Sequence, residues 1–141
     1  WFFYLRASSP RKYGQQYQSA MLCYNRCMEN EIRSTARAQD APGVEAAEGI
    51  MRKTLAYSPS QMLCHFSMKA GARIPLHNHE AAQIGYLIAG KARFFKESGE
   101  EFIAETGSSW AFPEWEKHGA EFLEDSEVVE VFSPLRPEYL D

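Results

Sequence analysis

Three of the four histidines in this chain are spaced so that they could bind one metal ion. One residue separates His77 from His79, Gln83 follows four positions after His79, and His118 lies in a later segment. On a β-strand, residues two apart point to the same face, so the first two imidazoles would approach a common point. Imidazole suits divalent transition metals, and the Gln83 amide could add an oxygen once the chain turns back. A His-x-His pair alone is equally typical of two surface histidines.

A carboxylate near the end of the chain is the candidate acid–base group. Val128, Glu130 and Phe132 alternate along one expected strand and share one face, which puts Glu130 among apolar neighbours. If that face points inward, burial would raise the pKa of the Glu130 carboxyl, as suits a general acid or base. The alternative is a glutamate on an edge strand that faces solvent.

These groups must be positioned by the elements that the sequence predicts. From residue 49 onward, short apolar runs alternate with turn signals that contain Gly, Pro and Ser. The runs predicted as strands are Met51–Tyr57, Gln61–Met68, Gln83–Ile88, Ala92–Phe95, Glu101–Ala104, Ser109–Phe112 and Val128–Phe132. Strands at this spacing, with no helical pattern between them, indicate an all-β sandwich or barrel.

The sequence before residue 49 has a different pattern. Between Tyr13 and Arg37, apolar residues recur at steps of three and four, which predicts an amphipathic helix. The segment Gln39–Gly43 contains Asp, Pro and Gly and is typical of a linker. We therefore expect an N-terminal α-helical extension and linker over residues 1–48 and a barrel over residues 49–141.

The composition limits the possible partners. The 141 residues are 45% hydrophobic and 24% charged, which fits one globular domain. The net charge of −4 argues against nucleic acid as the main partner. No apolar run approaches the ~20 residues of a membrane-spanning helix, so we expect no membrane partner. Three cysteines, an odd number in a chain long enough to bury its own core, favour a reduced, cytoplasmic setting.

The spacings taken together carry a family resemblance. The patterns Gly-x5-His-x-His-x3-Gln-x6-Gly, from Gly71 to Gly90, and Gly-x5-Pro-x4-His, from Gly107 to His118, resemble the two motifs of the cupin superfamily. The resemblance covers about residues 49–141 and implies a small jelly-roll β-barrel. It also implies a divalent transition metal (Zn, Ni, Fe or Mn), whose ligands would be His77, His79, Gln83 and His118. The family usually has Glu at the position of Gln83 and Gly at the position of Trp115.

The C-terminal tail narrows the resemblance. With His-x-His-x3-Gln-Ile-Gly-Tyr and Gly-x-Ser-Trp-x-x-Pro, the tail Val-Phe-Ser-Pro-x-Arg-x-x-Tyr looks like the small cupins of pectin and alginate catabolism. Those proteins linearise 4,5-unsaturated uronates. The resemblance implies a small acidic substrate, a homodimer, and an active site lined by Glu130, Phe132 and Arg136, with Asp as the usual residue at the Glu130 position. Arg136 would pair with the substrate carboxylate and Glu130 would transfer the proton.

Two other functions remain open for the same ligand set. A metal-dependent cupin dioxygenase would use Fe or Cu with these ligands, and a non-catalytic cupin would bind a ligand without turnover. The acid–base candidate Glu130 and the carboxylate anchor Arg136 favour an enzyme of the isomerase or lyase type.

Overall fold

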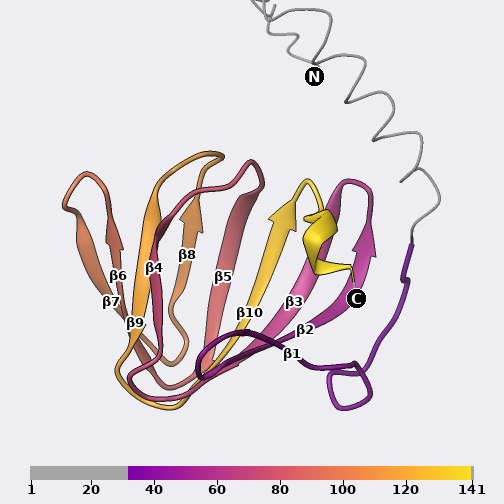
Figure 1. Ribbon diagram of the computed structural model, residues 1–141, viewed down its shortest axis with the longest axis horizontal. Coiled ribbons are helices and arrows are strands. Elements are labelled where there is room, and N and C mark those ends of the chain that lie inside the picture. Colours follow the sequence, from indigo (N-terminus) through magenta and orange to yellow (C-terminus); the bar gives the residue numbers. More distant parts are fainter. Residues whose placement is uncertain (1–31, 141) are drawn as a thin grey trace, which may run out of the picture. The chain divides into compact units, whose positions relative to one another are not determined.

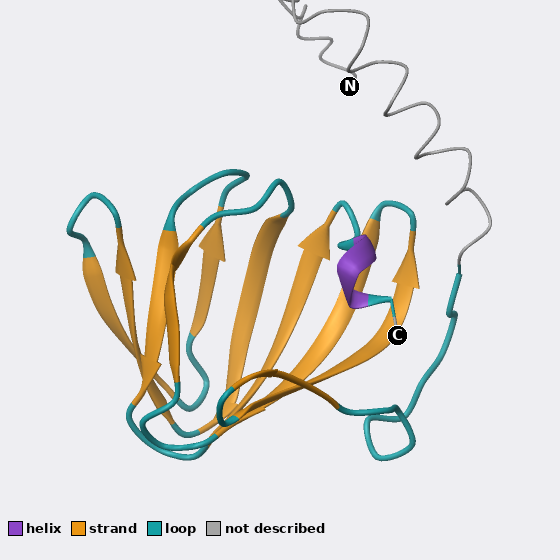
Figure 2. Ribbon diagram, in the orientation of Figure 1, coloured by secondary structure: helices purple, strands orange, loops and turns teal. Residues whose placement is uncertain are grey.

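The computed structural model describes residues 32–140, which form two antiparallel β-sheets (Figures 1 and 2). The elements are β1 (Val44–Ala47), β2 (Ile50–Ser58), β3 (Gln61–Met68), β4 (Arg73–His77), β5 (Ala82–Ala89), β6 (Lys91–Lys96), β7 (Glu101–Glu105), β8 (Ser109–Phe112), β9 (His118–Phe122), β10 (Ser126–Ser133) and the 3₁₀ turn η1 (Pro137–Tyr139). The larger sheet has the order β1-β2-β3-β10-β5-β8, and the smaller has the order β4-β9-β6-β7. Side chains of both sheets line one cavity between them.

The strands form because buried and exposed residues alternate along them. On β10, Val128, Glu130 and Phe132 are buried, whereas Glu127 and Val131 on the other face are exposed. Burying a Val or Phe side chain fully contributes roughly 1.5–3 kcal/mol, so this pattern fixes which face of each strand points inward. The largest fully buried side chains include Phe112, Phe122, Phe132, Met62, Leu87 and Val128.

Each of the seven predicted runs is a strand, which confirms the all-β prediction. Three further strands, β1, β4 and β9, were not predicted from the sequence, and each case has a physical reason. β4 lies at the edge of the smaller sheet and contains Pro75, which breaks the strand pattern. β9 is buried along most of its length, so its residues do not alternate. β1 pairs with β2, so the larger sheet already begins at Val44, within the stretch assigned to the extension and linker.

Most of the predicted helix, Tyr13–Arg37, lies outside the described residues. Its last part, residues 32–37, is described and is not helical, so this part of the prediction is wrong. Arg33 instead exchanges two backbone hydrogen bonds with Tyr57 on β2, at 3.1 and 3.0 Å. Within residues 32–140, no helix has the length and apolar character needed to cross a membrane.

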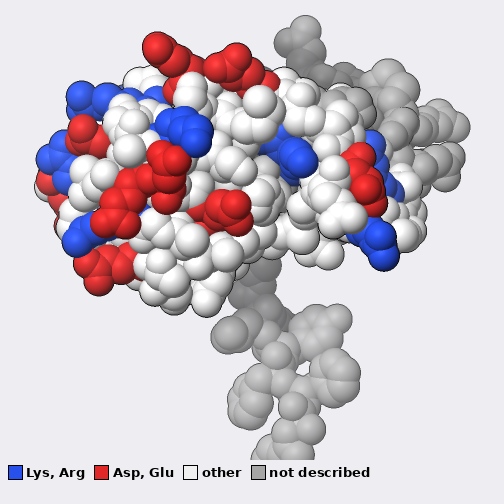
Figure 3. Space-filling view, turned by 90° about the horizontal axis from the view of Figure 1, so that it is seen from below, with Lys and Arg blue, Asp and Glu red and all other residues white. Residues whose placement is uncertain are grey.

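Opposite charges are interleaved on the outer face of the smaller sheet. Arg93 on β6 binds Glu121 on β9 at 2.6 Å, and Lys91 binds Glu105 on β7 at 2.7 Å. Figure 3 shows basic and acidic side chains intermixed at the end of the molecule where this sheet lies, on the left. Among residues 32–140, Glu130 is the one acidic side chain that is buried. It therefore differs from the surface carboxylates and needs a separate explanation.

Candidate metal centre and acid–base site

The three histidines of the two motifs lie together at one end of the cavity. His77 is the last residue of β4 and pairs in register with His118, the first residue of β9. The ring centroids of His77 and His118 are 4.6 Å apart, and those of His79 and His118 are 5.2 Å apart. One ring nitrogen of each histidine lies within 4.8 Å of the others. These distances would allow the three imidazoles to share one metal ion.

His77 and His79 converge, but not because they share one face of a strand, as the sequence led us to expect. β4 ends at His77, so His79 lies in the following loop and the same-face rule for strands does not apply to it. The His79 Nδ1–H donates to the Ala81 carbonyl at 2.7 Å, and this local hydrogen bond orients the ring. The centroids of the His77 and His79 rings are 5.6 Å apart.

Backbone carbonyls fix the tautomer of all three rings. Nδ1 lies 2.9 Å from the Pro75 carbonyl in His77, 2.7 Å from the Ala81 carbonyl in His79, and 2.7 Å from the Glu116 carbonyl in His118. A carbonyl oxygen can only accept, so each Nδ1 carries the proton and each Nε2 presents a lone pair. Metal-binding histidines are typically oriented in this way, by a hydrogen bond from the other ring nitrogen.

Two further observations test whether a metal fits these residues. The Nε2 atom of His118 is buried and has no hydrogen-bond partner, which is costly for a polar atom. The Nε2 atom of His79 faces the Gln83 Oε1 at 3.1 Å, so two acceptors point at each other. A cation between these groups would satisfy both. The residues present therefore fit a divalent metal, as the sequence analysis expected for His77, His79, Gln83 and His118.

Burial favours the neutral form of the His79 and His118 imidazoles, as metal binding requires. Desolvation lowers the pKa of His118 to about 4 and also lowers the pKa of His79, and the positive charge of Arg136 acts in the same direction on both. The His118 ring stacks on Phe112, with ring centroids 4.1 Å apart, which adds to its desolvation.

Gln83 connects the histidines to Glu130. Gln83 Nε2 donates to Glu130 Oε1 at 2.5 Å, and this bond turns the amide oxygen toward His79. Desolvation raises the pKa of the Glu130 carboxyl to about 7, although Gln83, Trp110 and Arg136 each favour the charged form. The Trp110 indole N–H favours the charged form of the Glu130 carboxylate, although its geometry does not make a hydrogen bond. Of the two alternatives that the sequence left open, Glu130 lies on the inward face of β10, an interior strand, and its carboxyl can both take and give a proton near neutral pH.

A row of residues across three strands explains how Trp110 approaches Glu130. Glu130 on β10 is opposite Gly85 on β5, and Gly85 is in turn opposite Trp110 on β8. A Cβ atom on Gly85 would lie only 2.2 Å from the Trp110 ring. The absence of a side chain at Gly85 therefore leaves the space in which the indole lies.

Arg136 and Phe132 lie beside the histidine cluster. The Phe132 ring is 5.8 Å from the His79 ring, measured between centroids. The Arg136 guanidinium carbon lies 5.3 Å from the Phe132 ring centroid and 4.2 Å from that of Tyr139. Tyr139 and Trp110 occur in the motifs quoted above, but sequence reasoning gave neither of them a role.

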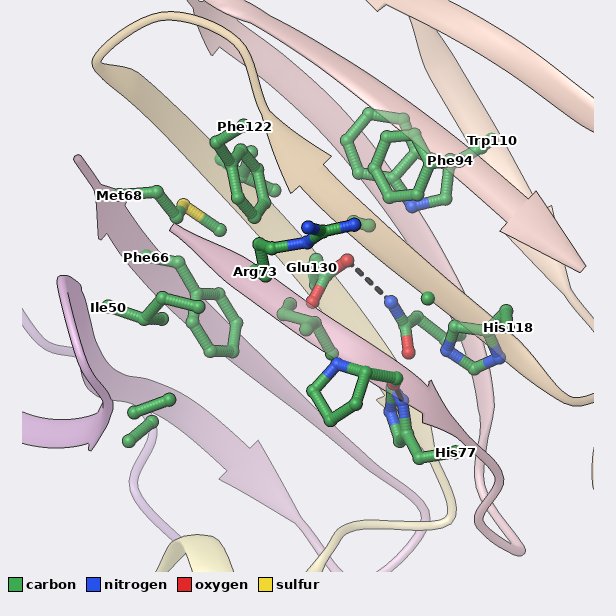
Figure 4. A pocket seen from close by; sticks show the side chains of 18 of the residues that line it. Ile50, Phe66, Met68, Arg73, His77, Phe94, Trp110, His118, Phe122 and Glu130 are labelled. Atoms are coloured by element: carbon green, nitrogen blue, oxygen red, sulfur yellow. Dashed lines mark hydrogen bonds between the residues drawn. The ribbon is translucent and has the colours of Figure 1, made fainter. Parts of the chain in front are cut away.

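The cavity has a volume of about 350 Å³ and two different ends (Figure 4). His77 and His118 line one end, Glu130 lies between the two ends, and Gln83 connects Glu130 to His79. Apolar side chains line the other end: Ile50, Phe66, Met68 and Phe122. The structure thus brings the expected site residues together. Those that line the cavity are His77, Gln83, His118, Glu130, Phe132 and Arg136, and His79 adjoins them through its contacts with Gln83, His118 and Phe132.

At position 115 this chain has tryptophan, where the second motif usually has glycine. Its backbone is in the left-handed region, with φ of 64°, and its N–H donates to the His79 carbonyl at 2.9 Å. Glycine adopts this conformation without steric cost, which is why a glycine suits the position. Trp115 adopts this conformation although it is not glycine, and the three histidines converge in its presence.

Comparison with known proteins identifies the family. Residues 64–133 match the cupin domain. The pectin degradation protein KdgF of Dickeya dadantii (strain 3937) is 33% identical to this chain over 103 residues, which are 72% of this chain and 93% of that protein. The chain belongs to the cupin family.

Solved cupin structures agree with this assignment. The structure of KdgF from Halomonas sp. matches this cupin with a TM-score of 0.71 and 33% identity, over 77% of this chain and 99% of that one. An RmlC-like cupin from Shewanella frigidimarina NCIMB 400 matches with a TM-score of 0.72 and 20% identity, over 77% and 96% of the two chains. The small cupin jelly roll predicted from the two motifs is therefore confirmed.

Proposed function

We propose that this cupin is a metal-dependent enzyme that linearises 4,5-unsaturated uronates. One observation carries the proposal: the Glu130 carboxyl, with its pKa raised to about 7, is buried in the cavity that His77 and His118 line, and these two converge with His79. The likeness to a pectin degradation protein, KdgF, supports a substrate derived from an acidic polysaccharide. The motif resemblance to uronate-linearising cupins supports the same substrate class.

The substrate carboxylate would bind Arg136. Its guanidinium packs against Tyr139 and Phe132, which limits its motion and keeps its plane fixed. A planar guanidinium can form two parallel hydrogen bonds to a carboxylate, which orients the substrate as well as binding it. Phe132 closes the wall of the cavity between Arg136 and His79.

Glu130 would transfer the protons. Linearisation breaks the bond between the ring oxygen and the anomeric carbon: the anomeric hydroxyl loses a proton and becomes an aldehyde, while the ring oxygen gains one and becomes an enol. The enol becomes a ketone when its hydroxyl proton leaves and carbon 4 gains a proton. The product is an isomer of the substrate, so no co-reactant is needed. A carboxyl with a pKa near 7 can both accept a proton and donate one in such transfers.

His77, His79, His118 and Gln83 would hold the metal, which supplies Lewis-acid polarisation of substrate oxygens when bound. Three imidazoles and an amide would bind the metal as neutral groups, so they would not cancel any of the cation's charge. This charge and that of Arg136 favour an anionic substrate in the cavity, despite the net charge of −4 of the whole chain.

The test is the rate at which 4,5-unsaturated galacturonate loses its enol-ether absorbance. Metal-loaded protein should accelerate this loss well above the spontaneous rate, and chelator-treated protein should not. If the metal-loaded protein gives only the spontaneous rate, the substrate assignment is wrong.

A further inference from the structure

Arg136 has a carboxylate partner within its own chain. Its Nε donates to Glu138 Oε1 at 2.8 Å, two residues further on in η1. The backbone N–H of Arg136 contacts the Met62 sulfur at 3.1 Å, which fixes where the side chain begins. Within residues 32–140, neither Nη atom of Arg136 makes a hydrogen bond. The guanidinium is thus held at one edge and open at the other.

A guanidinium offers two edges to a carboxylate. One edge is formed by Nε and one Nη, and the other by the two Nη atoms. Glu138 accepts from Nε, so the edge that contains Nε is already engaged. The Tyr139 ring centroid lies 4.2 Å from the guanidinium carbon, so the ring covers one face of the group. With one face covered and the Nε edge engaged, the Nη edge is left for a ligand.

We propose that Glu138 is a positioning residue, which holds Arg136 so that only its Nη edge receives the substrate carboxylate. This inference rests on the proposed function, because it takes a carboxylate substrate as the ligand of Arg136. Glu138 itself does not contact the substrate in this arrangement. Its effect on catalysis passes through the orientation of Arg136.

A competing role for Glu138 is that of an internal mimic, which would block Arg136 until a substrate displaces it. The geometry favours positioning, since a mimic would occupy the Nη edge rather than Nε. Repulsion between Glu138 and the substrate carboxylate is screened, because the Glu138 side chain is 57% exposed to water.

The test compares Glu138→Ala with Glu138→Gln. The alanine removes the acceptor for Nε, so the KM for 4,5-unsaturated galacturonate should rise about 3- to 10-fold while kcat changes less than about twofold. The glutamine keeps an oxygen that accepts from Nε, so its KM should stay near that of the unchanged protein. A KM for Glu138→Ala that is unchanged or lower overturns the proposal, and so does a glutamine variant as impaired as the alanine.

Two controls separate positioning from a general structural effect. In an Arg136→Met background, Glu138→Ala should add no further rise in KM, because the group that it positions is gone. Glu105→Ala removes another exposed glutamate that is bound to a cation, Lys91, at the opposite end of β6 from His118, and should leave KM unchanged. An added rise without Arg136 would overturn the proposal.

A binding measurement separates this proposal from the proposed function. Calorimetry with galacturonate, a saturated acid that cannot be linearised in this way, measures carboxylate binding alone. Glu138→Ala should weaken this binding about as much as it raises KM, and Glu138→Gln should not. If the metal-loaded protein binds galacturonate with this pattern but does not turn over the unsaturated acid, positioning stands and the proposed function fails. Equal affinity for all three proteins, or no binding by any of them, overturns the positioning role.

Discussion

At the scale of single residues, the direction of hydrogen bonds decides what the site can bind. Carbonyls of Pro75, Ala81 and Glu116 take the Nδ1 protons, so three Nε2 lone pairs are left to converge. The Gln83 amide is oriented by Glu130 in the same sense, with its oxygen toward His79. The same side chain therefore connects a metal-binding cluster to an acid–base group.

The burial of His118 predicts how the stability of the metal-free protein depends on pH. Its pKa is about 4 in the folded protein and near 6.5 when unfolded, so the unfolded chain binds more protons between these values. The contribution of His118 to stability is therefore full above about pH 6.5 and falls as the pH decreases toward 4. From pH 7.5 to 5 the free energy of unfolding should fall by about 2 kcal/mol from this group.

Urea denaturation at the two pH values, with chelator present, measures this change. Relative to His118→Gln, the unchanged protein should lose about 2 kcal/mol of unfolding free energy between these pH values, because both proteins share the opposite contribution of Glu130, whose pKa is raised. If the variant loses as much stability between the two pH values as the unchanged protein, His118 is not the cause.

At the scale of elements, three neighbouring strands of the larger sheet, β10, β5 and β8, build the acid–base site. The cross-strand row from Glu130 through Gly85 to Trp110 depends on register, because a shift of one residue would turn all three side-chain positions outward. The row also depends on Gly85 having no side chain.

Gly85→Ala should therefore damage the site and the fold together. The new methyl group would overlap the Trp110 ring, so the indole must shift away from Glu130. Overpacking of this kind typically costs about 1–3 kcal/mol, and the change should appear in both the free energy of unfolding and the tryptophan fluorescence. Ile84→Ala is the control, since Ile84 precedes Gly85 on β5 and is 60% exposed. Equal losses in the two variants would contradict this account of the row.

The sequence predicts the strands whose residues alternate and misses those whose residues do not. β10 and β3 show regular alternation, and both were predicted within one or two residues at each end. β4 and β9 carry His77 and His118, but Pro75 in one and near-complete burial of the other obscure the pattern. The motif spacings nevertheless identified both histidines, because ligand types and spacing do not depend on alternation.

Some features of the site have no signal in a single sequence. The position of His79 outside β4 depends on a loop hydrogen bond to Ala81, and the contact between Arg136 and Glu138 depends on the turn η1. Residues 32–37 fit a helical pattern, yet pairing of Arg33 with β2 determines their structure. Tertiary contacts outweigh local preference in each case.

At the scale of the whole molecule, metal binding and folding should be coupled. The histidines come from β4, the following loop and β9, so a binding site exists only when these elements are assembled. A metal that binds only the folded state at about 1,000 times its Kd adds about 4 kcal/mol to stability.

Adding a divalent metal to chelator-treated protein should therefore raise Tm by roughly 10 °C, as followed by circular dichroism. His118→Gln should lose most of this increase, whereas His65→Gln should keep it. His65 is the fourth histidine and lies beside Glu127 at 3.7 Å, outside the cluster. An equal increase in both variants would show that the metal binds elsewhere.

The central claim is that the buried Glu130 carboxyl transfers the protons of uronate linearisation. Its most direct test is the initial rate of enol-ether loss for Glu130→Gln against the unchanged protein, both metal-loaded and with equal metal content. The glutamine keeps the shape and can still accept from Gln83, but it cannot transfer a proton. The rate should fall by roughly 10²- to 10⁴-fold. A Glu130→Gln protein as fast as the unchanged one would contradict the account.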